Sequence, residues 1–181
     1  MAGDRAPDPA APGPGGDVAD RLALLQLEAE YARTWDLRDA DGWAGVFTAD
    51  GAFELGAVGE KPALRFAGTA ALADFCRRAT GRYDGIHLLS PPSLTIDGDT
   101  ARGWVHFQYF DRDRKTGARR QVVGVYAVTY RRTGPAGWRM HLRREQAVME
   151  DDVFAGFPTA ELMWGLGPDE APRPDEAPRP D

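Results

Sequence analysis

The sequence predicts an α+β fold, in which about three N-terminal helices pack on one face of a curved, antiparallel or mixed sheet. Three observations predict it. Apolar residues recur with helical spacing from residue 17 to about residue 37, and shorter helical segments follow before residue 80. From residue 86 onward the chain alternates as β-strands do, and turn sequences separate the alternating segments. Helices therefore come first and most strands later.

The first helix is predicted from Asp17, a suitable N-cap, to about Leu37. It carries two apolar stripes on roughly opposite sides. The first stripe comprises Val18, Leu22, Leu25, Ala29 and Ala32 and continues to Asp36. The second comprises Leu24, Leu27, Tyr31 and Trp35. If the first stripe faces the sheet, Asp36 is a carboxylate pointing toward the core, and it then needs a partner or a cavity.

A short second helix is expected at 41–47, and a third at 69–78 with Thr69 as its N-cap. The expected strands cover 52–55, 64–67, 86–94, 101–111, 121–132 and 138–150. Two prolines interrupt the segment 86–94, which is tolerated only at a sheet edge or a bulge. On the strand 101–111 the alternation places Trp104, His106 and Gln108 on one face, with Val105, Phe107 and Tyr109 on the other.

Composition excludes several classes of protein. The net charge of −6 gives no electrostatic reason to bind nucleic acid, and 43% hydrophobic residues are ordinary for a globular domain. No apolar run is long enough to span a membrane, and the N-terminus has no hydrophobic signal core, so we expect a cytoplasmic protein. The single cysteine, Cys76, is expected to be buried filler. Three histidines without ligand spacing predict no metal site, and we expect no cofactor.

Three segments are expected along the chain. Residues 1–16 consist mostly of Ala, Pro, Gly and Asp and predict a flexible leader. Residues 168–181 contain the hexapeptide Asp-Glu-Ala-Pro-Arg-Pro twice and predict an extended tail. Residues 17–167 are expected to form one domain.

The best candidate partner for Asp36 is His87, in the segment Gly85-Ile86-His87-Leu88-Leu89. Histidine suits general acid–base chemistry because its unperturbed pKa is near neutrality. The competing interpretations are that Asp36 caps the following loop or pairs with Arg33 or Arg38, and that His87 is a satisfied core residue.

Several short motifs, in this order and spacing, resemble the SnoaL-like polyketide cyclase family. That family belongs to the nuclear transport factor 2-like superfamily, together with scytalone dehydratase and ketosteroid isomerase. The motifs are Tyr31-Ala32 with Trp35-Asp36-Leu37-Arg38-Asp39, Trp43 with Phe47-Thr48-Ala49-Asp50-Gly51, Phe66-Ala67-Gly68, Gly85-Ile86-His87, Ile96-Asp97-Gly98-Asp99-Thr100-Ala101, Gly124-Val125-Tyr126, and Gly137-Trp138-Arg139 with Arg143. They span about residues 18–150.

The resemblance implies a cone-shaped α+β barrel with a deep pocket between the sheet and the helices. In scytalone-dehydratase-like members, an Asp at the end of the first helix and a His on a following strand face each other across that pocket, and Asp36 and His87 occupy the matching positions. The substrate-binding candidates are Tyr31, Trp35, Trp104, His106, Gln108 and Tyr126, with His106 as the match for a second family histidine. The full set of dehydratase residues is not matched. Glu145 is expected in a surface salt bridge, and the alternative is a pocket carboxylate if the last strand keeps its register. His141 and Arg143 are expected at the surface.

The leading hypothesis is a cofactor-free acid–base enzyme of specialised metabolism, such as antibiotic biosynthesis. It would be a cyclase, dehydratase or isomerase that removes a proton next to a carbonyl of an aromatic or polyketide-like small molecule. A second hypothesis is a non-catalytic module that binds a small molecule or a partner, and a homo-oligomer is expected in either case. A third is an epoxide-opening hydrolase or cyclase, which needs two carboxylates linked by an arginine. A relative of dioxygenase small subunits is a further alternative.

Overall fold

The structure, a computed structural model, describes residues 14–58, 61–134, 137–151, 153–154, 156–158 and 163, with side chains from residue 18 onward. The predicted tail at 168–181 lies outside these residues, as do residues 1–13 of the predicted leader. The first helix begins inside that leader, at Pro14. None of the helices in the described part of the chain is both long and apolar enough to cross a membrane.

Three helices and eight strands make up the described fold. The helices are α1 (Pro14–Asp36), α2 (Ala40–Gly45) and α3 (Thr69–Arg82). The strands are β1 (Phe47–Leu55), β2 (Leu64–Ala67), β3 (Tyr83–Leu89), β4 (Ser93–Asp97), β5 (Thr100–Asp113), β6 (Arg119–Arg132), β7 (Trp138–Glu150) and β8 (Val153–Phe154). The order matches the sequence prediction, and the two prolines fall in the break between β3 and β4. Strand β1 begins earlier than expected, directly after α2.

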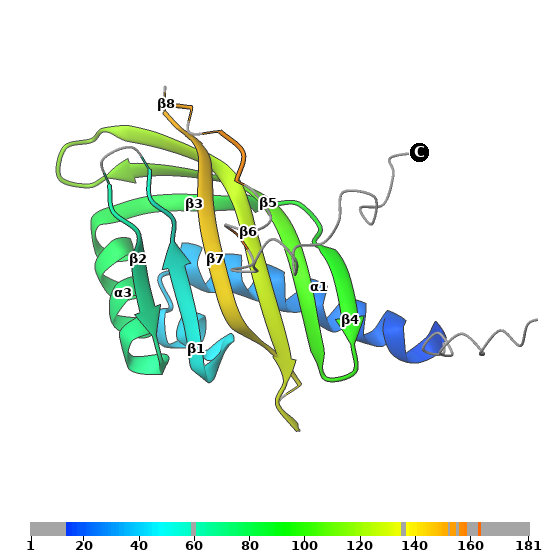
Figure 1. Cartoon of the computed structure of the whole chain (residues 1–181). Helices are drawn as coiled ribbons and strands as arrows, with labels where there is room; N and C mark the ends of the chain where they lie inside the picture. The colour runs from blue at the N-terminus through cyan, green and yellow to red at the C-terminus, as the bar shows by residue number, and fades with distance from the viewer. Residues whose placement is uncertain are drawn as a thin grey trace, which may run out of the picture.

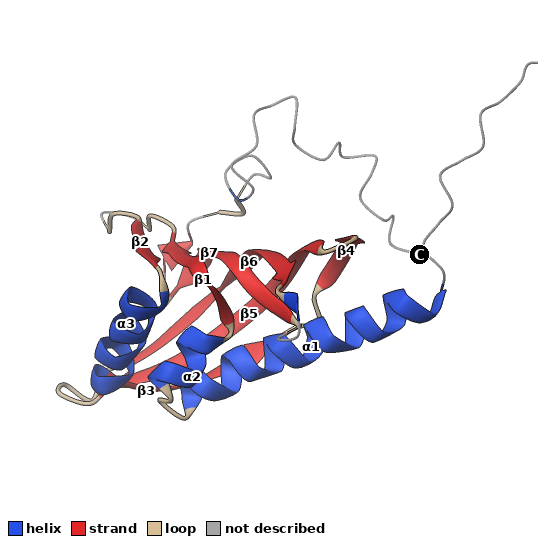
Figure 2. Ribbon diagram, turned by 90° about the horizontal axis from the view of Figure 1, so that it is seen from below, coloured by secondary structure: helices blue, strands red, loops and turns tan. Residues whose placement is uncertain are grey.

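The strands form one mixed sheet in the order β2-β1-β7-β6-β5-β3, with β4 pairing β5 and β8 pairing β7. Only the β1–β7 pair is parallel in the described register, and the others are antiparallel. Strands β5, β6 and β7 are the longest and cross the centre of the molecule (Figure 1). The sheet curves around the helices without closing, and α1, α2 and α3 gather on its concave side (Figure 2). This α+β architecture confirms the predicted fold class.

The second stripe of α1, not the first, packs against the sheet. Leu24, Tyr31 and Trp35 are buried, whereas Val18 is 64% exposed and Leu22 59% exposed. The premise that Asp36 continues the sheet-facing stripe was therefore wrong. Asp36 reaches the interior for another reason. It is the last residue of α1, and the helix ends beside β3, where the carboxylate accepts from the His87 backbone N–H.

The end of α1 is a tight reversal. Arg38 adopts a left-handed conformation (φ 63°), and its backbone N–H donates to the Trp35 carbonyl oxygen at 2.9 Å. The Asp39 side chain then caps α2 by accepting from the Gly42 backbone N–H at 2.9 Å. The helix therefore stops at Asp36, beside β3.

A bulge in β7 sets which of its side chains face the helices. The pairing with β6 shifts register between Thr129–Leu142 and Tyr130–Met140, so His141 is the extra residue. The alternation is inverted beyond the bulge, and Arg143 becomes fully buried while His141 stays partly exposed. The expectation that Arg143 lies at the surface was wrong for this reason.

Candidate active site

A cavity of about 220 Å³ lies between the concave face of the sheet and the helices. Most of its wall is aromatic. Three further lining side chains, His87, Arg120 and Glu145, can carry a charge or transfer a proton. The lining residues are Tyr31, Trp35, Phe53, Leu55, Phe75, Ala79, Tyr83, His87, Phe107, Tyr109, Arg120, Val122, Tyr126 and Glu145. An apolar chamber with a few convergent polar groups is the usual form of a small-molecule site.

Asp36 and His87 are in direct contact at the wall of this cavity. Asp36 Oδ1 lies 2.8 Å from His87 Nδ1, and the same carboxylate accepts from the His87 backbone N–H at 3.1–3.2 Å. The His87 side chain is 5% exposed and that of Asp36 is 21% exposed. The two competing arginine partners are engaged elsewhere, Arg33 with Glu30 and Arg38 with Asp84.

This contact determines the state of the imidazole. An ionised carboxylate only accepts hydrogen bonds, so Nδ1 carries the proton and Nε2 is left with its lone pair. Burial lowers the pKa of His87 below its usual value, and the Asp36 carboxylate offsets only part of that effect. The ring is therefore neutral near pH 7, with an acceptor nitrogen available to the cavity.

Tyr109 and Trp35 both pack against the imidazole of His87. Tyr109 lies directly opposite His87 in the β3–β5 pairing, and the two ring centroids are 4.4 Å apart. The Trp35 indole N–H donates to the Tyr109 hydroxyl at 3.2 Å. The absence of a side chain at Gly85 makes room for this phenol, because a Cβ there would meet the Tyr109 hydroxyl oxygen at 2.3 Å. Burial raises the pKa of Tyr109 to about 12, so its hydroxyl stays protonated.

A buried ion pair lies beneath the cavity. Arg143 Nη1 donates to both carboxylate oxygens of Glu28 at 2.8 Å, and the Tyr130 hydroxyl donates to Glu28 at 2.6 Å. The guanidinium carbon lies 3.9 Å from the ring centroid of Tyr31 and 3.8 Å from that of Tyr126. Glu28 was not predicted as a site residue. Its place in the sequence directly after Leu27, a residue of the second apolar stripe, was the available signal.

Glu145 faces the cavity, so the expectation of a surface salt bridge was wrong. It lies directly opposite Tyr126 in the β6–β7 pairing and opposite Leu55 in the β1–β7 pairing. Its side chain is half-buried among the residues that line the chamber. This burial raises the pKa of Glu145 to about 7, although the Tyr126 hydroxyl and Arg143 favour the ionised form.

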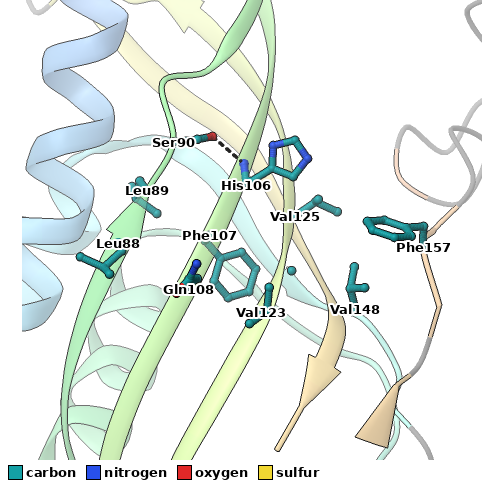
Figure 3. Close-up of a pocket in the computed structure, with 11 residues that line it drawn as sticks. Leu88, Leu89, Ser90, His106, Phe107, Gln108, Val123, Val125, Val148 and Phe157 are labelled. Carbon is teal, nitrogen blue, oxygen red and sulfur yellow. Dashed lines mark hydrogen bonds between the residues drawn. The ribbon is translucent and has the colours of Figure 1, made fainter.

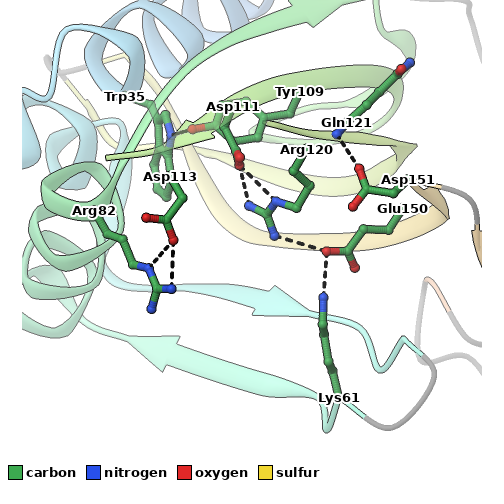
Figure 4. Close-up of polar contacts among 10 residues, drawn as sticks. All are labelled: Trp35, Lys61, Arg82, Tyr109, Asp111, Asp113, Arg120, Gln121, Glu150 and Asp151. Carbon is green, nitrogen blue, oxygen red and sulfur yellow. Dashed lines mark hydrogen bonds and ion pairs between the residues drawn. The ribbon is translucent and has the colours of Figure 1, made fainter. Parts of the chain in front are cut away.

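Arg120 lines the cavity and belongs to a charged network that reaches the surface at Lys61 (Figure 4). It pairs with Asp111 at 2.5 Å and with Glu150 at 3.1 Å, and Glu150 also pairs with Lys61 at 2.6 Å. An Asp–Arg–Glu chain of this kind has the composition that epoxide opening needs. Neither of its carboxylates, however, is among the described residues that line the cavity.

Tyr31, Trp35 and Tyr126 line the cavity with His87, whereas the other three substrate-binding candidates do not. Trp104, His106 and Gln108 lie on the opposite, outer face of β5. His106 and Gln108 border a separate, open pocket with Leu88 and Phe157 (Figure 3). Alternation along β5 was predicted correctly, but nothing in the sequence identified which of its two faces meets the helices.

No group of three or more His, Cys, Asp or Glu side chains in the described part of the chain is arranged to hold a metal ion. Cys76 is fully buried in α3, and burial raises the pKa of its thiol to about 12, which leaves it unreactive.

Comparison with known proteins supports the architecture. A family model for the SnoaL-like domain matches residues 16–144. An NTF2-like protein with a cystatin-like fold from Novosphingobium aromaticivorans is 27% identical, with a TM-score of 0.62 over 76% of this chain and 86% of that one.

Two further structures share the fold at 16% identity. One, from the same organism, is described as a "Putative Scytalone Dehydratase"; its TM-score is 0.66 over 78% of this chain and 94% of that one. The other is a hexachlorocyclohexane dehydrochlorinase, with a TM-score of 0.64 over 79% of this chain and 95% of that one. The search of curated proteins gives no match.

Proposed function

The chain belongs to the SnoaL-like domain family, and on that premise we propose that it is a cofactor-free acid–base enzyme. It would act as a cyclase, dehydratase or isomerase on an aromatic or polyketide-like small molecule. The single observation that carries the proposal is the 2.8 Å contact between Asp36 and His87 Nδ1 at the wall of an aromatic cavity.

The proposed chemistry begins with His87. Its Nε2 removes a proton from a substrate carbon next to a carbonyl, while Asp36 holds the ring in the required tautomer and stabilises the imidazolium that forms. The hydroxyls of Tyr31 and Tyr126 support the developing enolate by hydrogen bonding. Arg143 lies behind both phenol rings, so its positive charge favours negative charge in front of them.

The aromatic wall supports the proposed substrate class. Tyr31, Trp35 and Phe107 line the cavity, and contact between aromatic rings adds to the hydrophobic contribution when a planar ring binds. Two of the similar structures are described as a dehydratase and a dehydrochlorinase, which are eliminating enzymes. Those descriptions support a proposed reaction that begins with the removal of a proton from the substrate.

The test uses 2-tetralone, a two-ring ketone with acidic protons next to its carbonyl, in deuterated buffer. The protein should accelerate exchange of these protons as followed by NMR, and His87→Gln should slow the exchange by about 10²–10⁴-fold. His106→Gln is the matched control, because that imidazole lies on the outer face and should leave the rate unchanged.

Two results would contradict the proposal. The assignment of His87 fails if His87→Gln exchanges the protons as fast as the wild-type protein. If 2-tetralone binds with no acceleration by any form of the protein, the alternative of a non-catalytic binding module is favoured instead.

We also propose that two copies associate through the outer face near β3. Ile86 is 54% exposed, Leu88 53% and Phe110 37%, and Ile86 lies opposite Phe110 in the β3–β5 pairing. Such a row of exposed apolar side chains is typical of an interaction surface. Sedimentation should show a dimer that Leu88→Lys dissociates, and a monomeric wild-type protein would contradict this.

A further inference from the structure

Glu145 is a second titratable side chain in the cavity that contains His87. The two residues come from different parts of the sheet, Glu145 from β7 and His87 from β3. Both border the same chamber of about 220 Å³. Strands β6 and β5 separate β7 from β3, so three inter-strand spacings of about 4.8 Å place the two backbones roughly 14 Å apart along the sheet. The concave curvature then turns both side chains toward the same space.

The arginines near Glu145 are all engaged by other acids. Arg143 pairs with Glu28, Arg144 with Glu54 on the outer side, and Arg120 with Asp111 and Glu150. Among the described residues, Glu145 has no ion pair within 4 Å.

Burial favours the protonated carboxyl of Glu145, while its hydrogen bond with Tyr126 and the nearby arginines favour the ionised form. The charged and titratable groups that face it are Arg143 and Glu150 on β7, Arg120 and Tyr126 on β6, and Tyr31 on α1. Burial outweighs the attraction of the arginines, and the pKa of the carboxyl rises to about 7. A group of this kind holds a proton near neutral pH and can also release it.

We propose that Glu145 is a catalytic acid, placed across the cavity from His87, that donates its proton to the departing oxygen of the substrate. The inference rests on the function proposed above and narrows it, because an acid on the leaving oxygen assigns the reaction to the class of water eliminations. The substrate class is a neutral hydroxy-carbonyl compound whose hydroxyl is lost.

The step balances within the cavity. His87 Nε2 takes the proton from carbon, and the electron pair of the C–H bond forms the new C=C bond. The C–O bond breaks, and the oxygen takes the Glu145 proton and leaves as water. The site is left with an imidazolium at His87 and a carboxylate at Glu145, and a proton passing from one to the other through water restores the starting state.

Two probes of one reaction can test this role without the natural substrate. In benzisoxazole a base removes the proton on carbon, the N–O bond breaks, and the oxygen departs as a phenol oxygen. In 5-nitrobenzisoxazole the same bonds change, but the departing phenolate is far less basic and needs no proton. An acid at Glu145 should therefore assist the first probe and not the second.

Wild-type protein should accelerate both probes. Glu145→Gln should lower kcat/KM for benzisoxazole by about 10²-fold or more and change that for 5-nitrobenzisoxazole by less than about threefold. The wild-type rate with benzisoxazole should also fall as pH rises through about 7, and this fall should be lost in Glu145→Gln. Glu54→Gln is the matched control, because that carboxylate lies on the neighbouring strand and pairs with Arg65 and Arg144 outside the cavity.

The outcomes separate the two proposals. His87→Gln should abolish acceleration of both probes, and if it does not, the proposed function fails. If His87→Gln behaves as expected but Glu145→Gln slows both probes equally or neither, only the role of Glu145 is overturned. A wild-type protein that accelerates neither probe contradicts both proposals. Carbon-13 NMR of the Glu145 carboxyl gives an independent readout, and a midpoint near the ordinary glutamate value of about 4.3 overturns the acid role alone.

Discussion

The guanidinium carbon of Arg143 lies over the rings of both Tyr31 and Tyr126, within 4 Å of each ring centroid. Its Nη1 is bound to Glu28, while Nε and Nη2 have no hydrogen-bond partner among the described residues. Both phenol rings contact this guanidinium through cation–π interaction. A fixed positive charge behind two cavity hydroxyls is the main electrostatic feature of this site.

Removing Arg143 should destabilise the fold strongly, because Glu28 would be left buried and unpaired. We expect Arg143→Met to lower the free energy of unfolding by about 3–5 kcal/mol. Urea denaturation measures this. The double variant Glu28→Gln/Arg143→Met should recover part of the loss, and a double variant less stable than Arg143→Met alone would show that the pair is not the cause.

Asp36→Asn should keep the fold and lose activity. The amide has nearly the same shape, but it no longer forces the proton onto His87 Nδ1 or stabilises the imidazolium. The rate of 2-tetralone proton exchange should fall by about 10²–10⁴-fold. Circular dichroism checks that the fold is intact, and a folded variant with unchanged exchange would contradict the role of Asp36.

Gly85→Ala should disturb the site through Tyr109. The new Cβ would meet the Tyr109 hydroxyl oxygen at 2.3 Å, so the phenol must leave its place against His87 and Trp35. We expect slower proton exchange and lower thermal stability. Gly81→Ala is the control, because nothing described lies within 4 Å of a Cβ at that helical position, and it should be neutral or stabilising.

The stability of Glu145→Gln relative to the wild-type protein should depend on pH. The folded-state pKa of Glu145 is raised to about 7, so the folded wild-type protein holds a proton there that the unfolded chain releases above about pH 4.5. The protonated Glu145 therefore stabilises the folded wild-type protein at low pH. This contribution to the free energy of unfolding is lost as pH rises through 7. Between pH 5 and pH 8 the variant should gain up to about 3 kcal/mol relative to the wild-type protein. Urea denaturation at both pH values gives the difference, and a constant difference would contradict the raised pKa.

The order of the elements, helices first and most strands later, was predictable from the sequence. Apolar spacing and turn residues depend on local structure, and a single sequence displays both directly. The contact between Asp36 and His87 was also predicted, from the family resemblance and from an argument about the helix stripe that was wrong. The left-handed Arg38 that ends α1 gives no signal in the sequence, since arginine is not a usual residue for that conformation.

The roles of Arg143 and Glu145 were not predictable for a related reason. Strict alternation from Trp138 along β7 places both residues on the outer face, and the bulge at His141 turns them inward. A bulge depends on pairing with a distant strand, and a single sequence does not display that pairing. The outward placement of His106 likewise depends on which face of β5 the helices cover.

The central claim is that Asp36 holds His87 as a neutral base with a free Nε2, and nitrogen-15 NMR of labelled histidine tests it most directly. The His87 signals are assigned by their loss in His87→Gln. At pH 7 we predict a protonated Nδ1, an unprotonated Nε2 and a His87 pKa below the ordinary histidine value of about 6.5. A proton on Nε2 of the neutral ring, or a fully protonated imidazolium at pH 7, would contradict the account.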